Sequence, residues 1–210
     1  MMLITGFVPY KEKLNASEAL ISSMRSNLPD ELRNFESQLA FELIEVDETS
    51  RETEHQTLET QLLCLLKKYK PTLCIFTGQA PPYNKITIEK VGLNSFMGQL
   101  IHADRPVAYW SDLPGIETLP AAVEAQNIPA THSYYAGQHL CNHILHSSLY
   151  FSEHLSLSHR SGFIHIPVLP GQVKEVYKNS ACMPLEMTRK ALLAIIKHVM
   201  AMEAYTIMAE

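Results

Sequence analysis

Short apolar runs alternate with amphipathic helical patterns along this chain, and that alternation constrains the fold more than any other feature. The clearest run is LCIFT at residues 73–77, which is typical of a strand buried on both faces. It follows a helical pattern of leucines at 58–69 and ends in a glycine-containing loop at 78–82. Strands that alternate with helices predict an α/β fold. We expect an α/β/α sandwich with a mainly parallel, twisted central sheet covered by helices on both faces.

The same periodicity gives the expected elements. Strands are expected at residues 2–5, 39–46, 73–77, 86–94, 129–134 and 163–168. Helices are expected at about 15–26, 58–69, 114–125 and 184–202, with another after Cys141. The polar stretch 47–57 indicates a solvated loop or an exposed first turn of the helix that follows. At 210 residues, without a repeat or a linker, the chain is expected to form one domain over residues 1–210.

The composition argues against some binding partners and indicates the cellular compartment in which the protein is expected. A formal net charge of −5 argues against a general nucleic-acid binder, and no apolar run reaches the length of a membrane span. The N-terminus lacks the basic region and long apolar core of a signal peptide, so we expect a cytoplasmic protein with its four cysteines reduced. Their spacing matches neither a CxxC motif nor a common zinc site.

Cys141 lies where an expected strand gives way to a helical pattern. A cysteine at the start of a helix is favoured as thiolate by the unpaired N–H groups and the helix dipole. The same N–H groups can hold an oxyanion. A buried structural cysteine is the plainer interpretation of a lone cysteine. Cys141 is the candidate nucleophile because other residues of the chain can complete a catalytic set with it.

Two other residues can complete a catalytic set with this cysteine. His165 lies inside an apolar strand, where the direction of its ring is fixed, and it is the candidate base. Glu89 lies in the alternating stretch 86–94 and is the candidate for orienting the imidazole. Either residue alone could equally be structural: a satisfied core histidine, or a glutamate that faces solvent.

A cluster of histidines offers a competing hypothesis. His139, His143 and His146 are spaced so that a helix with an early start would place them on one face, where they could bind a divalent metal. There is no HExxH motif and no evident carboxylate partner nearby. We therefore expect neither a metal nor a cofactor.

Taken together, these segments resemble the pyroglutamyl peptidase I, or pyrrolidone-carboxylate peptidase, family of cysteine peptidases. The resemblance follows nearly the whole chain in order. It is carried by TGFVPY at 5–10 with Asn15, GQA at 78–80, ITIEKVGLN at 86–94, PVAYW at 106–110, AGQHLCNH at 136–143 and GFIHIPVLPGQ at 162–172. Several specific motifs in the right order make this a strong match.

The resemblance implies an enzyme that removes an N-terminal pyroglutamate from peptides through a thioester acyl-enzyme. It assigns the catalytic roles to Glu89, Cys141 and His165. It also implies substrate-binding roles for Phe7, Tyr10, Asn15, Gln79, His139 and Leu140. No cofactor, nucleic acid or membrane is implied, whereas a homodimer or homotetramer is allowed.

This chain departs from the family pattern at three places. Tyr10 and His139 stand where the family has phenylalanines that clasp the pyroglutamate ring, whereas Phe7 is kept. Pro81 and Pro82 replace the two glycines of the GQAGG loop, and the segment carrying a family arginine is missing.

Gln99 falls where that arginine would stand and is the candidate to replace it near the reacting carbonyl, but only with a neutral donor. We therefore expect a peptidase that works but is slow beside its relatives. These changes leave one alternative open: a divergent, weakly active or inactive homologue that binds a pyroglutamyl-like small ligand.

Overall fold

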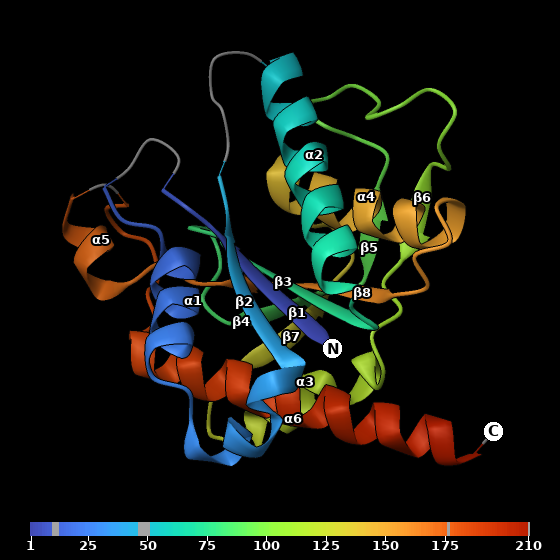
Figure 1. Cartoon of the computed structure of the whole chain (residues 1–210). Helices are drawn as coiled ribbons and strands as arrows, with labels where there is room; N and C mark the ends of the chain where they lie inside the picture. Colours follow the sequence, from blue (N-terminus) through green and yellow to red (C-terminus); the bar gives the residue numbers. More distant parts are fainter. Residues whose placement is uncertain (10–12, 46–50, 176, 210) are drawn as a thin grey trace.

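The computed structural model describes residues 1–9, 13–45, 51–175 and 177–209. At its centre lies a six-stranded sheet with the strand order β2-β1-β3-β8-β4-β7 (Figure 1). Its strands are β1 (Met2–Phe7), β2 (Leu39–Ile44), β3 (Leu73–Gln79), β4 (Ile86–Glu89), β7 (Ala130–Ser133) and β8 (Arg160–Ile166). β5 (Val91–Leu93) and β6 (Ala108–Trp110) form a separate antiparallel pair.

The sheet is mainly parallel, as the sequence predicts, with one antiparallel junction. β1 pairs in parallel with β2 and β3, and β3 pairs in parallel with β8. β4 runs antiparallel to β8 but parallel to β7. The strand expected over 86–94 is therefore wrong in its extent, because the chain leaves the central sheet at Lys90. The N–H of Lys90 donates to the carbonyl of Ser133, whereas its carbonyl accepts from the N–H of Ser111.

Helices cover both faces of the sheet, and this confirms the α/β sandwich. They are α1 (Ala16–Ser26), α2 (Arg51–Tyr69), α3 (Leu119–Glu124), α4 (Leu140–His154), α5 (Pro170–Glu175) and α6 (Leu185–Ala209), with two 3-10 segments, η1 (Asp30–Gln38) and η2 (Ile116–Thr118). One apolar layer joins the sheet to α1, α3 and α6. The other joins it to α2 and α4, which lie together on the opposite face (Figure 1). No helix in the described part of the chain could cross a bilayer.

Of the two alternatives for residues 47–57, a loop or the first turn of a helix, the structure shows the helix where it describes the stretch. α2 begins at Arg51, so the helix includes the polar stretch RETEHQT, whereas residues 46–50 lie outside the described ranges. Arginine, glutamate and glutamine are good helix formers. A run of polar residues therefore indicates a solvent-facing position, and it leaves open whether the backbone there is a helix or a loop.

Candidate active site

Cys141 lies in the first turn of α4, as the sequence predicts. The preceding strand β7 ends at Ser133, and His139 is the N-cap residue of the helix. Cys141 is partly exposed, whereas Cys74 is buried and burial raises the pKa of its thiol. Among the described residues no side chain caps this helix start. The N–H groups of its first turn are therefore available to a negatively charged oxygen.

The register of three neighbouring strands brings the candidate base and carboxylate to one face of the sheet. His165 on β8 lies beside Gly78 on β3 and opposite Thr87 on β4. Glu89 lies two residues beyond Thr87 and opposite Phe163. Because alternate residues of a strand share a face, Glu89 and His165 project from the same side as diagonal neighbours, two residues apart along the ladder.

Glu89 and His165 are bonded across this ladder. The Nδ1–H of His165 donates to Oε1 of Glu89 at 2.7 Å, and both residues are buried. Burial alone would lower the pKa of His165. The charge and hydrogen bond of Cys141, together with the hydrogen bond and charge of Glu89, outweigh burial and raise that pKa to about 9. At neutral pH His165 therefore holds a proton beside the Cys141 sulfur.

Gly78 makes room for the cysteine. A Cβ atom at this position would lie 2.9 Å from Sγ of Cys141 and 2.6 Å from the ring of Phe163. Any larger residue would push the sulfur away from the sheet, because the ring of Phe163 closes the other side. Gly78 therefore allows the start of α4, which carries Cys141, to lie close to the strand that carries His165.

Known proteins match this chain over nearly its whole length. The family model described as Pyroglutamyl peptidase matches residues 1–202. The chain belongs to the pyroglutamyl peptidase family. It is 31% identical over 208 residues to the pyrrolidone-carboxylate peptidase of Brachyspira hyodysenteriae, covering 93% of this chain and 96% of the relative.

Solved structures of pyroglutamyl peptidases have the same fold. The pyrrolidone carboxyl peptidase from Thermococcus litoralis superposes with a TM-score of 0.80 at 26% identity, covering 95% of this chain and 93% of that one. The pyroglutamyl peptidase I from Bacillus amyloliquefaciens gives a TM-score of 0.79 at 26% identity, covering 94% and 93%. The fold and the enzyme family are therefore shown, whereas the roles of individual residues are argued from the geometry.

Several side chains that are expected to bind substrate make contacts within the protein instead. Phe7 is buried at the end of β1, in the apolar cluster that also holds Leu140. Asn15 caps α1, with Oδ1 accepting from the N–H of Ser17 at 2.8 Å. Gln79 ties segments together, because its Oε1 accepts from the N–H of Ala16 and from Gln172. Tyr10 lies outside the described residues.

His139 and Gln99 lie on the segments that border the start of α4. The ring of His139 contacts that of Phe96, with 5.5 Å between centroids. Gln99 closes a tight turn with Phe96, and it is exposed. The Met97 N–H of that turn donates to the Gln138 carbonyl at 2.7 Å. The turn therefore borders the segment that leads into Cys141, and the role of Gln99 at the reacting carbonyl stays a prediction.

The three histidines of the competing hypothesis point to different partners. α4 begins at Leu140, so His139 precedes the helix. The Nε2–H of His143 donates to Oε1 of Glu59, and that of His146 donates to the carbonyl of Pro106. No group of three or more histidine, cysteine, aspartate or glutamate side chains suited to a metal occurs within the described ranges. The contacts of His143 and His146 serve to anchor α4.

Asn142 is a positioning residue that the sequence reasoning missed. It is fully buried, and its Nδ2 donates to the carbonyls of Leu93 and Ser95 at 2.9 and 2.6 Å. Its Oδ1 accepts from the N–H of Leu93 at 2.8 Å. These bonds fasten the residue after Cys141 to the segment that follows Glu89. An asparagine directly after a candidate nucleophile was the only signal in the sequence.

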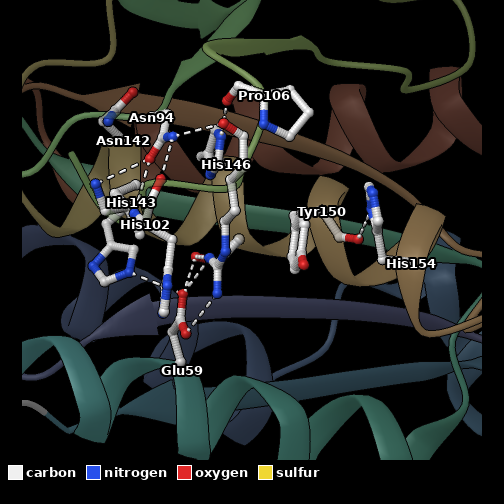
Figure 2. A network of polar contacts seen from close by, with 12 residues as sticks. Glu59, Asn94, His102, Pro106, Asn142, His143, His146, Tyr150 and His154 are labelled. Carbon is white, nitrogen blue, oxygen red and sulfur yellow. Dashed lines mark hydrogen bonds and ion pairs between the residues drawn. The ribbon is translucent and has the colours of Figure 1, made fainter.

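A buried ionic cluster beneath α4 was missed as well (Figure 2). Arg105 donates from both terminal nitrogens to the carboxylate of Glu59 on α2, at 2.6 and 3.0 Å. Ser147 and His143 on α4 donate to the same carboxylate. Burial would raise the pKa of Glu59, but these hydrogen bonds hold it well below its usual range. The cluster joins α2, α4 and the 94–106 segment.

Asn94 organises the segment that Arg105 anchors. Its Oδ1 accepts from the N–H groups of Ile101 and His102, whereas its Nδ2 donates to the carbonyls of His102 and Arg105 (Figure 2). All of these bonds are at most 3.1 Å. An irregular segment thereby acquires one conformation without forming a strand or a helix. The Gln99 turn is part of it.

Proposed function

We propose that this chain is a cysteine exopeptidase that hydrolyses the bond after an N-terminal pyroglutamate of peptides. The observation that carries the proposal is the His165 imidazole, bonded to Glu89 at 2.7 Å and electrostatically coupled to Cys141 at the start of a helix. Relatives that match the chain over most of its length bear the name pyrrolidone-carboxylate peptidase, which supports the reaction class.

Acylation begins from a thiolate and an imidazolium. The Cys141 sulfur attacks the carbonyl carbon between pyroglutamate and the next residue, and a tetrahedral oxyanion forms. His165 then donates its proton to the departing amine, the carbon–nitrogen bond breaks, and a thioester remains on Cys141. Glu89 stabilises the imidazolium before this transfer and keeps the proton of Nδ1 directed away from the substrate.

Deacylation uses the same residues in the reverse protonation states. Neutral His165 removes a proton from a water molecule, whose oxygen attacks the thioester carbonyl. The carbon–sulfur bond of the second tetrahedral intermediate breaks, and pyroglutamate leaves. Cys141 is again a thiolate beside the His165 imidazolium. The N–H groups of the first turn of α4 stabilise both oxyanions.

Specificity for a blocked amino terminus follows from the apolar side of the site. Phe7 at the end of β1 and Leu140 at the start of α4 are the apolar residues that the family resemblance assigns to the lactam ring, and each keeps a small exposed fraction of 6%. A free α-amino group in such a site would bury an unpaired positive charge, at a cost of several kcal/mol. We therefore expect peptides with an N-terminal pyroglutamate to be the substrates. Assembly as a homodimer or homotetramer stays a prediction.

The test is hydrolysis of a pyroglutamyl-arylamide by the wild type and by Cys141→Ser. The wild type should release the arylamine, whereas the mutant should lose activity while its circular dichroism spectrum is unchanged. Cys64→Ser and Cys182→Ser are matched controls, because both cysteines are exposed and neither lies at a helix start. Near wild-type activity in Cys141→Ser would refute the cysteine mechanism.

Alkylation provides a readout that needs no substrate. Iodoacetamide should label Cys141 at pH 7 faster than Cys64 and Cys182, although those two thiols are exposed. Rapid labelling without hydrolysis, combined with measurable binding of a pyroglutamyl amide, would replace the peptidase by the binding homologue. Labelling of all three at one rate would contradict an activated thiol.

A further inference from the structure

One oxygen of the candidate catalytic carboxylate lacks a donor at hydrogen-bond distance among the described residues. Oε1 of Glu89 accepts the bond from His165, but Oε2 is buried and makes no hydrogen bond in the described part of the chain. Glu89 itself is fully buried. A carboxylate oxygen that is removed from water without a donor is costly, so such an oxygen usually has a hydrogen-bond partner.

Tyr83 covers this pair of residues from the loop after β3. A turn in which its N–H donates to the carbonyl of Ala80 directs the residue back over the sheet. Its ring meets the imidazole of His165 edge to face, at 5.3 Å between centroids and 86° between planes. Phe163 contacts the same imidazole at 4.8 Å. His165 therefore contacts two aromatic rings and the carboxylate of Glu89.

The hydroxyl of Tyr83 reaches the strand beside Glu89. It donates to the carbonyl of Tyr135 at 3.4 Å, which is long for a hydrogen bond between oxygens. Tyr135 follows β7, on which Ser133 is the register partner of Glu89. Burial, followed by the negative charges of Glu89 and Cys141 and by a side-chain interaction of the hydroxyl with the Glu89 carboxylate, raises the pKa of Tyr83 despite a hydrogen bond with Ser133. The phenol is thus a neutral donor at every working pH.

We infer that Tyr83 is a positioning residue of the Glu89–His165 pair, through a hydroxyl that turns from the Tyr135 carbonyl to Oε2 of Glu89 and a ring that shields His165 from water. The inference rests on the proposed function only for its effect on turnover. Tyr83 and His165 each interact electrostatically with Glu89 and with Cys141.

The hydroxyl and the ring have opposite effects on the acidity of His165. A donor on Oε2 draws negative charge away from Oε1, so it makes the imidazolium a better acid toward the leaving amine. The ring excludes water, so it strengthens the attraction among Glu89, His165 and the thiolate. Loss of the hydroxyl alone should raise the basicity of His165, whereas loss of the whole ring should lower it.

The test compares Tyr83→Phe, which removes only the hydroxyl, with Tyr83→Leu, which also removes the ring. Tyr205→Phe is the matched control, because Tyr205 is exposed on α6. Hydrolysis is measured with a pyroglutamyl-arylamide and with pyroglutamyl-alanine, whose amine is the poorer leaving group. The second readout is the pH midpoint of iodoacetamide labelling of Cys141, followed on its peptide by mass spectrometry. The midpoint is insensitive to access, which changes only the rate.

Tyr83→Phe should lower kcat on pyroglutamyl-alanine by roughly threefold to tenfold, the size of one ordinary hydrogen bond, with KM unchanged. Its effect on the arylamide should be smaller. The labelling midpoint should move to lower pH in Tyr83→Phe and to higher pH in Tyr83→Leu, with Tyr205→Phe equal to wild type.

Three results would overturn the inference. They are wild-type kinetics and midpoint in Tyr83→Phe, a change confined to KM, and an effect produced by Ser133→Ala but absent from Tyr83→Phe. If the wild type hydrolyses neither substrate, the proposed function fails. The two labelling midpoints then still decide whether Tyr83 acts on the Glu89–His165 pair.

Discussion

Replacement of Glu59 by glutamine should destabilise the protein by about 3–5 kcal/mol, because it leaves Arg105 as a buried cation without its counter-ion. The side chain of Arg105 is 6% exposed and that of Glu59 is 14% exposed, so water cannot take the place of the carboxylate. Arg105 also stacks on the ring of Tyr150, with its guanidinium carbon 4.3 Å from the centroid. Its charge therefore cannot turn to solvent without losing that contact.

Removal of both charges should cost less than removal of one. Arg105→Met alone should also cost about 3–5 kcal/mol, since it strands the Glu59 carboxylate. Glu59→Gln combined with Arg105→Met removes both charges and should be less destabilised than either single variant. Arg33→Met is the control, because Arg33 and Asp30 form an exposed pair at 2.8 Å. Its loss should change stability by less than about 1 kcal/mol.

Urea unfolding followed by circular dichroism measures these differences. Fluorescence is a poorer choice, because the single tryptophan, Trp110, is already exposed in the folded state. A loss of 3–5 kcal/mol lowers Tm by about 10 °C for a chain of this length. Costs below about 1 kcal/mol for both single variants, or a double variant equal to their sum, would refute the buried-pair argument.

Acid should erase the difference between wild type and Glu59→Gln. The pKa of Glu59 is lowered in the folded state, so its contribution is complete above the pKa of an unfolded glutamate, about 4.3. The contribution is lost as pH falls below that value, because the unfolded chain then binds a proton that the folded chain resists. A difference in unfolding free energy that stayed constant from pH 7 to pH 3 would contradict this assignment.

Three further predictions concern the candidate site. Glu89→Gln should lower kcat by at least ~10²-fold with little change in KM, by analogy with the aspartate of a serine triad, and steady-state kinetics that match wild type would exclude the role. The rate of hydrolysis should fall above about pH 9, where His165 loses its proton, and activity undiminished at pH 10 would contradict the raised pKa of His165. The same raised pKa stabilises the folded protein fully below about pH 6.5, and this stabilisation is lost as the pH rises through about 9. Gln99→Arg should raise kcat in single-turnover assays if the turn directs position 99 at the carbonyl, and an unchanged rate in an already fast enzyme would show that the arginine is not needed.

Local sequence patterns predict many of the strands and helices of this fold. Continuous apolar runs predict the buried strands β1 and β3, and a 3.6-residue period predicts α1 and the long α6. Asn15 is identifiable as a helix cap from the residues around it, because capping depends only on neighbours along the chain. The position of Cys141 at a helix start follows in the same way.

Local sequence fails where a segment's environment changes. Residues 86–94 alternate as one strand, yet the chain crosses from the central sheet into the β5–β6 pair at Lys90. The polar residues before the leucines of α2 are compatible with a loop or with a helical turn, and only the structure shows that the helix begins at Arg51. Periodicity reports which side of a segment is buried, and it carries no information on which sheet or layer the segment joins.

The sequence by itself determined the order of strands and helices, the start of the nucleophile's helix and the residue types available for catalysis, because each depends on neighbours along the chain. Only the tertiary structure decided which of these residues meet. Glu89 bonds His165 across 76 positions of sequence, and Arg105 bonds Glu59 across 46. Such pairs depend on strand register and on how helices lie against the sheet. Both are set by packing between distant segments, which local patterns of polarity do not encode.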